Sequence, residues 1–544
     1  MSSLKQDIQS RIIKFFSTGL IAVLICLFYS SAVHSQTVYH HISNRSVYYF
    51  LDEMAIIGLI DINSQVLPFS REYIAKRFSE LDTCRTRLNS RQQKELDFFL
   101  RDFNKELQPD KNFTKRFDVF YYKDSLFTLS ANVIAGLQYW TNTNGSVYHR
   151  WNGGEVFSYC GPHWGFYASL RDNHESVPIS DSPFMTDRMG ANYKGKNDYS
   201  EMRGCITYTW NWGNVGLVKD HFTWGSNYHG PVILSGRTPS FVRFQLTLKP
   251  VHWFEFNYIH GWLVSEEVDS TRSYWTNNSY GPTYQKVFHP KYLAANFFTI
   301  VPIKKLHISA GNSIVYSDLG NNPAYLIPVF FYKSVDHTLN AGINNQNSQM
   351  FLDISSKNIR NVHLFGTVFI DELAISRMTD KNKHSNFWAW KLGTRINPPV
   401  ENLSLIMEYT RSNPLTFRHI TPTLTYESNR YNLGHYLTDN AVEYYIACTY
   451  KPLPRLLAEV SFTWAKKGPD YSLLGGTRLG LPFMESTAWE EKQVSCNLRY
   501  QLINDFYIFA SYQYTSTAGD VDLFMPDIWW GKTNTLTAGM NFGF

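Results

Sequence analysis

Aromatic and short polar side chains alternate along two stretches of the chain, in a pattern that suits the binding of sugars. The faces of Trp and Tyr rings stack on the apolar faces of pyranose rings, while Asp, Asn, His and Arg bond the hydroxyls. The first stretch covers residues 220–231 and the second covers residues 408–435. The candidate polysaccharide-binding residues are Asp220, Trp224, Tyr228, Arg237, Glu408, Tyr409 and His435.

Two of these residues have roles that their chemistry suggests. We expect the ring of Trp224 to act as a stacking platform and the carboxylate of Asp220 to accept hydrogen bonds from sugar hydroxyls. The competing interpretation is that such residues are interfacial aromatics of a membrane protein, or side chains that pack its loops.

Signals for catalysis and cofactor binding are weak throughout. The sequence contains no GxSxG elbow, no HExxH pair and no EF-hand loop. Residues 190–196 (GANYKGK) mimic a phosphate-binding loop, but Asn197 stands where Ser or Thr would bind magnesium. The histidines show no metal-ligand spacing on one strand face. We therefore expect a protein that is not an enzyme and holds no cofactor or metal; an outer-membrane hydrolase is the enzymatic alternative.

The elements that must position these residues are β-strands. From about residue 117 onward, apolar and polar residues alternate with the period of two that strands require. Residues 535–544 (TLTAGMNFGF) show it most clearly, with one apolar face and one small, polar face. A soluble antiparallel sheet with one wet face would show the same alternation. Aromatic residues near the segment ends favour an outer-membrane β-barrel instead.

Turn spacing predicts the number of strands. Tight turns occur near residues 160–162, 213–214, 249–250, 301–302, 357–358, 398–399, 451–452 and 504–505. Long polar stretches alternate with them, as in bacterial outer-membrane barrels. With an opening strand near residues 125–139 and a closing strand at residues 533–544, the count is about 18 strands.

The predicted fold class is therefore mainly β: a transmembrane antiparallel barrel over residues 117–544, with short turns in the periplasm and long loops outside the cell. The inward-facing set mixes both charges and comprises Arg243, Gln245, Glu255, Asn257, Glu408 and Glu459. A lumen of this width holds water unless loops fill it.

Residues 36–116 precede the barrel and are predicted to form a small periplasmic helical module. Val47, Phe50, Leu51 and Met54 follow helical spacing. We expect a second helix over residues 71–81, opened by Ser70, and a third that begins with a capping box of Ser90 and Gln93. Such a module is too small to bury much core and should dock on something larger.

Residues 1–35 have the pattern of a secretory signal peptide. Lys5, Arg11 and Lys14 precede an apolar run over residues 15–28, and a small-residue cleavage site follows at residues 33–35. A single anchoring helix and a lipoprotein acylated at Cys26 are the alternatives.

Composition limits the remaining classes. The chain has 544 residues, 16% of them aromatic and 18% charged, with a formal net charge of +5. Its abundant apolar side chains argue against disorder. Its low net charge argues against the clustered Lys and Arg residues that nucleic-acid binding requires. The cysteines beyond residue 35 are widely spaced without a CxxC pair, so neither a structural metal nor a disulfide framework is expected.

Four blocks of the sequence occur in an order that is typical of one protein family. They are KDHFTWGSNYHGPVILSGRTP at residues 219–239, GTVFIDE at 366–372, EYTRSNPLTF at 408–417 and NLGH at 432–435. In sequence and order these blocks resemble the Wzi capsule-assembly family, a group that also contains the gliding-motility protein RemB. The resemblance implies an outer-membrane barrel with a periplasmic helical bundle that binds capsular polysaccharide.

We thus expect a non-enzymatic outer-membrane protein that binds or anchors capsular or surface polysaccharide. Its expected partners are that polysaccharide, outer-membrane lipid and the capsule-export or motility machinery, without nucleic acid. The alternatives are a porin-like diffusion or export channel and an accessory component of gliding motility or surface secretion.

Overall fold

The computed structural model describes residues 36–107, 116–279, 281–318, 320–339, 345–373, 386–471 and 481–543. The predicted signal peptide at residues 1–35 lies outside these ranges, and so do residues 108–115 of the predicted helical module. No helix among the described residues is long and apolar enough to cross a membrane.

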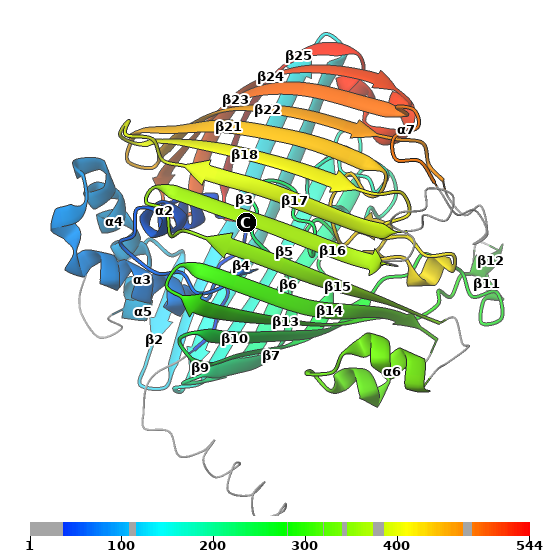
Figure 1. Cartoon of the computed structure of the whole chain (residues 1–544), viewed down its shortest axis with the longest axis horizontal. Helices are drawn as coiled ribbons and strands as arrows, with labels where there is room; N and C mark the ends of the chain where they lie inside the picture. The colour runs from blue at the N-terminus through cyan, green and yellow to red at the C-terminus, as the bar shows by residue number, and fades with distance from the viewer. Residues whose placement is uncertain are drawn as a thin grey trace, which may run out of the picture.

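The main body is a closed antiparallel barrel of 18 strands, which confirms the predicted fold class (Figure 1). Its strands are β3 Phe127–Asn142, β4 Gly145–Cys160, β5 Trp164–Glu175, β6 Asp198–Trp210, β7 Gly213–Lys219, β9 Val242–Val251, β10 Phe254–Leu263, β13 Lys291–Ile303, β14 Leu306–Ser317, β15 Gln346–Ser356, β16 Val362–Glu372, β17 Phe387–Ile396, β18 Leu403–Ser412, β21 Ala441–Leu453, β22 Leu456–Lys467, β23 Trp489–Ile503, β24 Phe506–Gly519 and β25 Lys532–Phe542.

The barrel closes where the last strand pairs with the first. Residues 536–542 of β25 pair with residues 135–141 of β3. A short strand that the sequence analysis did not predict, β2 (Phe120–Lys123), pairs with the remaining part of β3, from Thr128 to Ala131. Two small hairpins are separate from the barrel sheet: β11 Tyr274–Asn278 with β12 Gly281–Gln285, and β19 Glu427–Ser428 with β20 Tyr431–Asn432.

Alternation along each strand divides the wall into two faces. On β25, Leu536 and Met540 point outward and are 58% and 51% exposed, whereas Thr533 and Thr535 point inward and are buried. Strands all round the barrel expose large apolar side chains in the same way, among them Ile206, Leu217, Leu392, Met407, Ile446, Val460 and Leu498. The outer surface is therefore an apolar belt, as in barrels that face lipid.

The N-terminal module contains helices α2 Arg45–Ile56, α3 Arg71–Thr83, α4 Ser90–Asp102 and α5 Asn104–Leu107. Val47, Phe50, Met54, Phe78 and Phe99 lie in its buried core. The Ser70 side chain caps α3, as predicted. The capping box of α4 is shifted by one residue: Asn89 and Gln92 form it, because Ser90 is already the first helical residue.

The module docks on the end of the barrel where the short turns lie (Figure 1). Asn89 and Arg91 both donate to the side-chain oxygen of Asn402, at 3.1 and 2.7 Å. Glu53 of α2 is held by Arg91 of α4 and, at 2.9 Å, by Lys451 of β21. Buried ion pairs and hydrogen bonds thus join the two parts.

Two segments enter the lumen and meet inside it. Strand β1 (Val66–Leu67), which lies between α2 and α3, pairs with β8 (Thr223–Trp224) in the connection from β7 to β9. The Gly225 amide also donates to the backbone oxygen of Gln65 at 2.9 Å. Residues 220–241, here called the plug loop, are thereby tied to the helical module.

The plug loop fills one side of the lumen with a hydrophobic core. Its residues Trp224, Ile233 and Leu234 pack against inward-facing residues such as Phe297 and Phe351. The remaining members of this cluster include Phe222, Val232, Phe241, Ile259, Leu293, Val315, Phe369, Phe417, Tyr426 and Leu433. The opposite side of the lumen, near β3 to β5 and β22 to β25, is polar and hollow.

Candidate functional site

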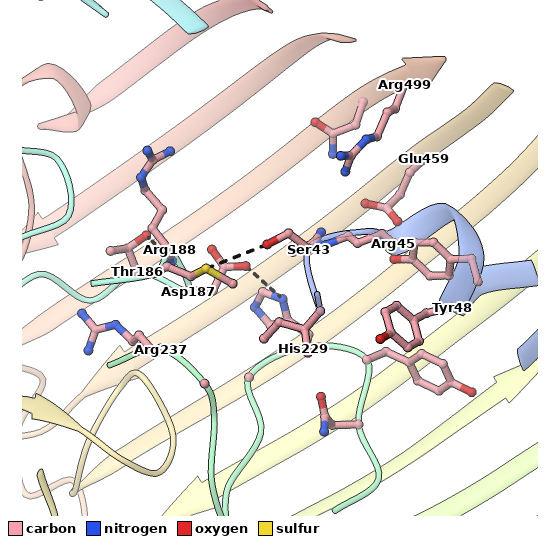
Figure 2. A pocket seen from close by; sticks show the side chains of 18 of the residues that line it. Ser43, Arg45, Tyr48, Thr186, Asp187, Arg188, His229, Arg237, Glu459 and Arg499 are labelled. Carbon is pink, nitrogen blue, oxygen red and sulfur yellow. Dashed lines mark hydrogen bonds and ion pairs between the residues drawn. The ribbon is translucent and has the colours of Figure 1, made fainter. Parts of the chain in front are cut away.

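The hollow side of the lumen is a cavity of about 870 Å³. Strands β3 to β5 and β22 to β25 form its wall, α2 and the residues before it form one boundary, and residues 184–189 with the plug loop form another. Figure 2 shows charged side chains of both signs turned toward it, among them Arg45, Asp187, Arg188, Glu459 and Arg499.

Helix α2 places its residues at the cavity because its two sides face different surroundings. Phe50 and Met54 belong to the module core, whereas Arg45, Tyr49 and Asp52 line the cavity. The residues before α2 continue this boundary, since Ser43 lies 3.9 Å from the sulfur of Met189 (Figure 2). The module therefore supplies part of the site.

Tyr228 of the plug loop lies at the centre of a buried polar network. Its hydroxyl is 2.7 Å from both Asp52 Oδ2 and His363 Nδ1. Asp52 also pairs with Lys357 at 2.8 Å and with Arg395 at 2.7 Å. The phenol ring is therefore fixed between α2 and the barrel wall, at the boundary of the cavity.

Glu408 holds the plug loop at the same place. Its carboxylate accepts hydrogen bonds from the backbone amides of Tyr228, at 2.6 Å, and His229, at 3.2 Å. Lys391 balances the charge of Glu408 at 2.7 Å. Glu408 thus orients two residues that line the cavity, although it is not itself among them.

His229 presents an imidazole to the cavity in a charged environment (Figure 2). Its ring stacks on Tyr445 at a centroid distance of 4.2 Å, and its Nε2 lies 3.2 Å from Glu443. Burial opposes the charged form, but the Glu443 carboxylate and then Asp187 outweigh it and raise the pKa of His229 above its usual value.

Arg237 also lines the cavity, at the far end of the plug loop. It donates to the backbone oxygen of Phe184 at 2.5 Å, and its guanidinium lies 5.3 Å from the centre of the Tyr431 ring. Burial lowers the pKa of Arg237 to about 10, so the side chain remains a cation near neutral pH.

The structure brings together only part of the predicted binding set. Tyr228 and Arg237 line the cavity, and Glu408 supports Tyr228. His435 is buried behind His229, with its Nε2 3.2 Å from the carboxylate of Glu443 that His229 also contacts.

The other members lie elsewhere. Trp224 is 1% exposed and stacks on Phe297 with an interplanar angle of 12°, so its ring faces are occupied by core residues in this conformation. Tyr409 follows Glu408 on a strand and therefore points to the outer face, where it packs on Trp390 and Tyr444. Asp220 is buried in a separate polar cluster.

Most charged residues at the cavity were missed by the binding prediction. Arg45, Asp187 and Arg499 come from a helix start, a long loop and a strand, and no local pattern connects them. Glu459 did stand in the predicted lumen-facing set. The alternation of polar and apolar residues that placed Glu459 in this set could also have identified Arg499, because its polar side chain lies at an inward position of a strand.

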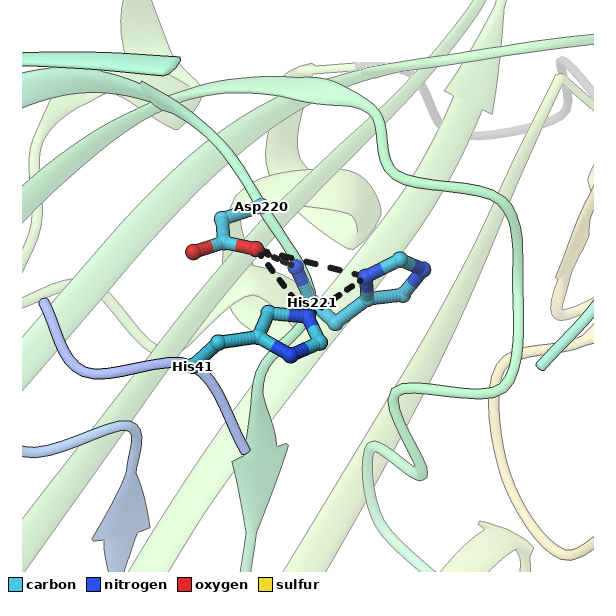
Figure 3. Close-up of side chains that lie close together, drawn as sticks. All are labelled: His41, Asp220 and His221. Atoms are coloured by element: carbon cyan, nitrogen blue, oxygen red, sulfur yellow. Dashed lines mark hydrogen bonds and ion pairs between the residues drawn. The ribbon is translucent and has the colours of Figure 1, made fainter. Parts of the chain in front are cut away.

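The separate cluster contains His41, Asp220 and His221 (Figure 3). His41 Nε2 lies 3.2 Å from His221 Nδ1 and 3.5 Å from Asp220 Oδ1. The sequence spacing did not reveal it, because His41 comes from the segment before α2. These contacts tie that segment to the plug loop.

The guanidinium of Arg203 lies beside this cluster. Arg203 Nη1 approaches Asp220 Oδ1 at 3.6 Å, and burial together with Arg203 lowers the pKa of His41 well below its usual value. The Ser43 amide donates to His41 Nδ1 at 3.2 Å, which leaves the proton of neutral His41 on Nε2, facing His221. We therefore describe the cluster as a hydrogen-bonded contact.

Comparison with solved protein structures supports the barrel fold. No family model matches this chain, and no curated protein sequence matches it. Among solved structures, it is similar to Wzi, an outer membrane protein involved in group 1 capsule assembly in Escherichia coli, described as a carbohydrate binding β-barrel. The TM-score is 0.57 and the identity 11%, over 94% of this chain and 100% of that chain. This likeness shows a shared fold.

Two further solved structures cover less of the chain. Pseudomonas aeruginosa OprD has a TM-score of 0.41 and 11% identity, over 76% of this chain and 94% of that chain. Acinetobacter baumannii OccAB3 has a TM-score of 0.42 and 9% identity, over 76% of this chain and 99% of that chain.

Proposed function

We propose that this protein is a non-enzymatic outer-membrane protein that binds a surface polysaccharide and holds one saccharide segment in the cavity of its lumen. The observation that carries the proposal is the cavity itself: about 870 Å³, lined by aromatic rings and by charged side chains of both signs, in a barrel whose other side is filled by the plug loop. Shared fold with a carbohydrate-binding barrel supports it.

The outer membrane is the location that the wall favours. Residues such as Leu217, Leu392 and Leu536 are each at least half exposed on the outer face. An apolar surface that surrounds a whole barrel would be unfavourable in water, whereas it suits contact with lipid. Short turns face the periplasm in such barrels, so the helical module lies on the periplasmic side and the long loops face the exterior.

The chemistry of the cavity suits a sugar with hydroxyl or carboxylate groups. Arg45 and Arg188 can donate paired hydrogen bonds to such oxygens, and Asp187 can accept from hydroxyls. Tyr48 and Trp529 supply ring surface at the same cavity. These residues extend the predicted binding set, of which Tyr228 and Arg237 remain members.

A lumen that the plug loop fills on one side favours binding over the alternative of a diffusion channel. The pairing of β1 with β8 and the packing of Trp224 on Phe297 connect the module, the plug loop and the wall. On the side of the lumen that the plug loop fills, a water path would require these contacts to open. A steady conductance of the unmodified protein in planar bilayers would support the channel instead.

The test is retention of the cell's own surface polysaccharide by the purified protein in detergent. We expect fragments of it to bind, and Arg45→Gln or Asp187→Asn to weaken binding about tenfold, because each removes a charge-assisted hydrogen bond. Glu266→Gln, at an exposed position in the connection from β10 to β11, is the matched control and should bind normally.

A deletion strain gives the second readout. It should lose cell-attached polysaccharide while continuing to secrete it. A strain that keeps its surface polysaccharide, together with folded protein that retains none, would refute the proposed function.

A further inference from the structure

The outer wall of the barrel carries a polar patch at a place where lipid-facing residues are expected. His260 of β10, Asn296 of β13 and Asn312 of β14 point outward, since each pairs in register with residues of the outer face. His260 and Asn296 are fully buried and Asn312 is 7% exposed. Something outside the wall must cover them.

The cover is the connection between β14 and β15. Its 3-10 helix (Pro323–Leu326) and helix α6 (Tyr332–Leu339) lie against the outside of the wall (Figure 1). Tyr325 and Tyr332 pack onto the outward side chains of Tyr258 and Tyr316. We call residues 323–335 the external cover.

Asparagine side chains on the wall satisfy the irregular backbone of this cover. Asn296 Nδ2 donates to the backbone oxygens of Pro328 and Phe330, each at 2.9 Å. Asn312 Nδ2 donates to Asn296 Oδ1 at 2.7 Å, and Asn312 Oδ1 accepts from the Tyr332 amide at 2.9 Å. Tyr258 donates to the backbone oxygen of Tyr325 at 2.8 Å.

The cover lies at the level of the apolar belt. His260 pairs with Phe244, Phe244 with Leu217 and Leu217 with Ile206 along neighbouring strands. Phe244, Leu217 and Ile206 point outward and are 38%, 50% and 50% exposed. The polar patch under the cover is therefore a continuation of the surface that faces lipid.

The free surface of the cover is apolar. Leu326, Ile327, Val329, Phe330 and Phe331 all point away from the wall and are exposed, Val329 most strongly at 62%. In hydrocarbon, non-helical backbone is stable only when protein groups bond it, and here Asn296 and Asn312 do so. In water, the exposed apolar side chains of the cover would form an unfavourable hydrophobic patch.

We propose that the external cover is inserted into the outer leaflet of the membrane, where its apolar side chains contact lipid acyl chains. The inference rests on the proposed outer-membrane location. It adds a second type of membrane contact to the barrel: an irregular segment that lies on the wall, shields a polar patch and enlarges the lipid-facing surface on the side of β10, β13 and β14.

Site-directed spin labelling tests it in the intact protein reconstituted into phospholipid vesicles. Cys84, Cys160, Cys205, Cys448 and Cys496 are first replaced by Ser, and single cysteines are then introduced as Val329→Cys and Phe331→Cys. Leu352→Cys on the outer face of β15 is the lipid-exposed control, and Trp275→Cys in the β11–β12 hairpin is the water-exposed control. Collision with oxygen and with a water-soluble nickel chelate is measured.

We expect labels at 329 and 331 to match Leu352→Cys, with oxygen access several-fold above that at Trp275→Cys. Water-like access at 329 and 331, with a lipid-like control, would overturn the inference. Shielding from both reagents would also overturn it, because a second copy of the chain would then cover the segment. A water-like label at residue 352 would instead refute the membrane location of the barrel.

A second variant tests the role of the asparagines. Asn296→Leu combined with Asn312→Leu leaves the backbone of the cover without partners, so the label at 329 should become mobile and gain access to the nickel chelate. Ser348→Ala, an outward-facing change on β15, is the control and should leave the spectrum unchanged. An immobile, lipid-exposed label in the double variant would contradict the proposed arrangement.

Discussion

At the scale of single residues, neighbours in the chain serve different parts of the molecule. Trp224 completes the hydrophobic core of the plug loop, while Tyr228, four positions later, faces the cavity. Glu408 and Tyr409 are adjacent, yet one supports the plug loop and the other packs on the outer wall. Residue type alone therefore does not identify a binding residue; its face does.

The packing of Trp224 leads to a stability prediction. Trp224→Ala removes a fully buried ring from the core, and we expect it to destabilise the folded barrel by about 3–5 kcal/mol. The measurement is the urea midpoint of reversible unfolding in detergent micelles. Trp275→Ala, at an exposed hairpin position, should change stability by less than about 0.5 kcal/mol.

The same variant separates the packing role from the predicted stacking role. A Trp224→Ala protein with unchanged stability and lost polysaccharide binding would restore Trp224 as a sugar platform and contradict its place in the core.

At the scale of elements, the barrel could be predicted because strand alternation and turn residues are local signals. The number of strands and the end at which short turns lie both follow from them. The pairing of β1 with β8 could not be predicted, since two residues on each side carry no pattern and the contact joins distant segments. Gln65 and Gly225, which flank that contact, line the cavity, so no sequence pattern predicted this part of its boundary.

The start of α4 gives a prediction at this scale. Asn89→Ala removes the cap and the bond to Asn402, and we expect a loss of about 1–2 kcal/mol in the stability of the module. Asn89→Ser retains the cap and should recover most of it. Ser90→Ala should have little effect; a larger loss there than at Asn89 would favour the originally predicted capping box. Thermal unfolding followed by helical circular dichroism measures all three.

The plug loop gives a second prediction at the scale of elements. Replacing residues 222–241 by a short Gly-Ser linker removes the core that fills one side of the lumen, so conductance in planar bilayers should rise roughly tenfold or more. Shortening the β11–β12 hairpin, which lies outside the barrel, is the control and should leave the conductance low. A plug-loop variant that folds but shows no conductance would indicate that other segments close the lumen.

At the scale of the whole molecule, buried charges hold the module on the barrel. Glu53 contacts Arg91 within the module and Lys451 of the wall. Burial opposes ionisation of Glu53, but Lys451 and Arg91 outweigh it and lower its pKa to about 2. Burial raises the pKa of the neighbouring Glu95, so Glu53 is the carboxylate of this cluster that gains most from staying charged.

Acid should therefore weaken the attachment of the module. A lowered pKa means that the stabilisation is complete above the usual value of 4.5 and is lost as the pH falls toward about 2. Glu53→Gln should remove about 3–5 kcal/mol at neutral pH and flatten this acid dependence. Asp82→Asn, on the exposed side of the module, is the control. Thermal unfolding between neutral pH and pH 3 provides the measurement, and a Glu53→Gln protein with unchanged acid dependence would contradict the assignment.

Helix α2 has one further consequence. It contributes Phe50 and Met54 to the module core and Arg45 and Asp52 to the cavity, with close packing on both sides. Closely packed groups transmit displacement instead of absorbing it. A binding partner that shifts the module would therefore reshape the cavity, and by thermodynamic linkage a ligand in the cavity would change the affinity of the module for that partner. Through one helix, occupancy of the cavity inside the barrel would change the outer surface of the helical module.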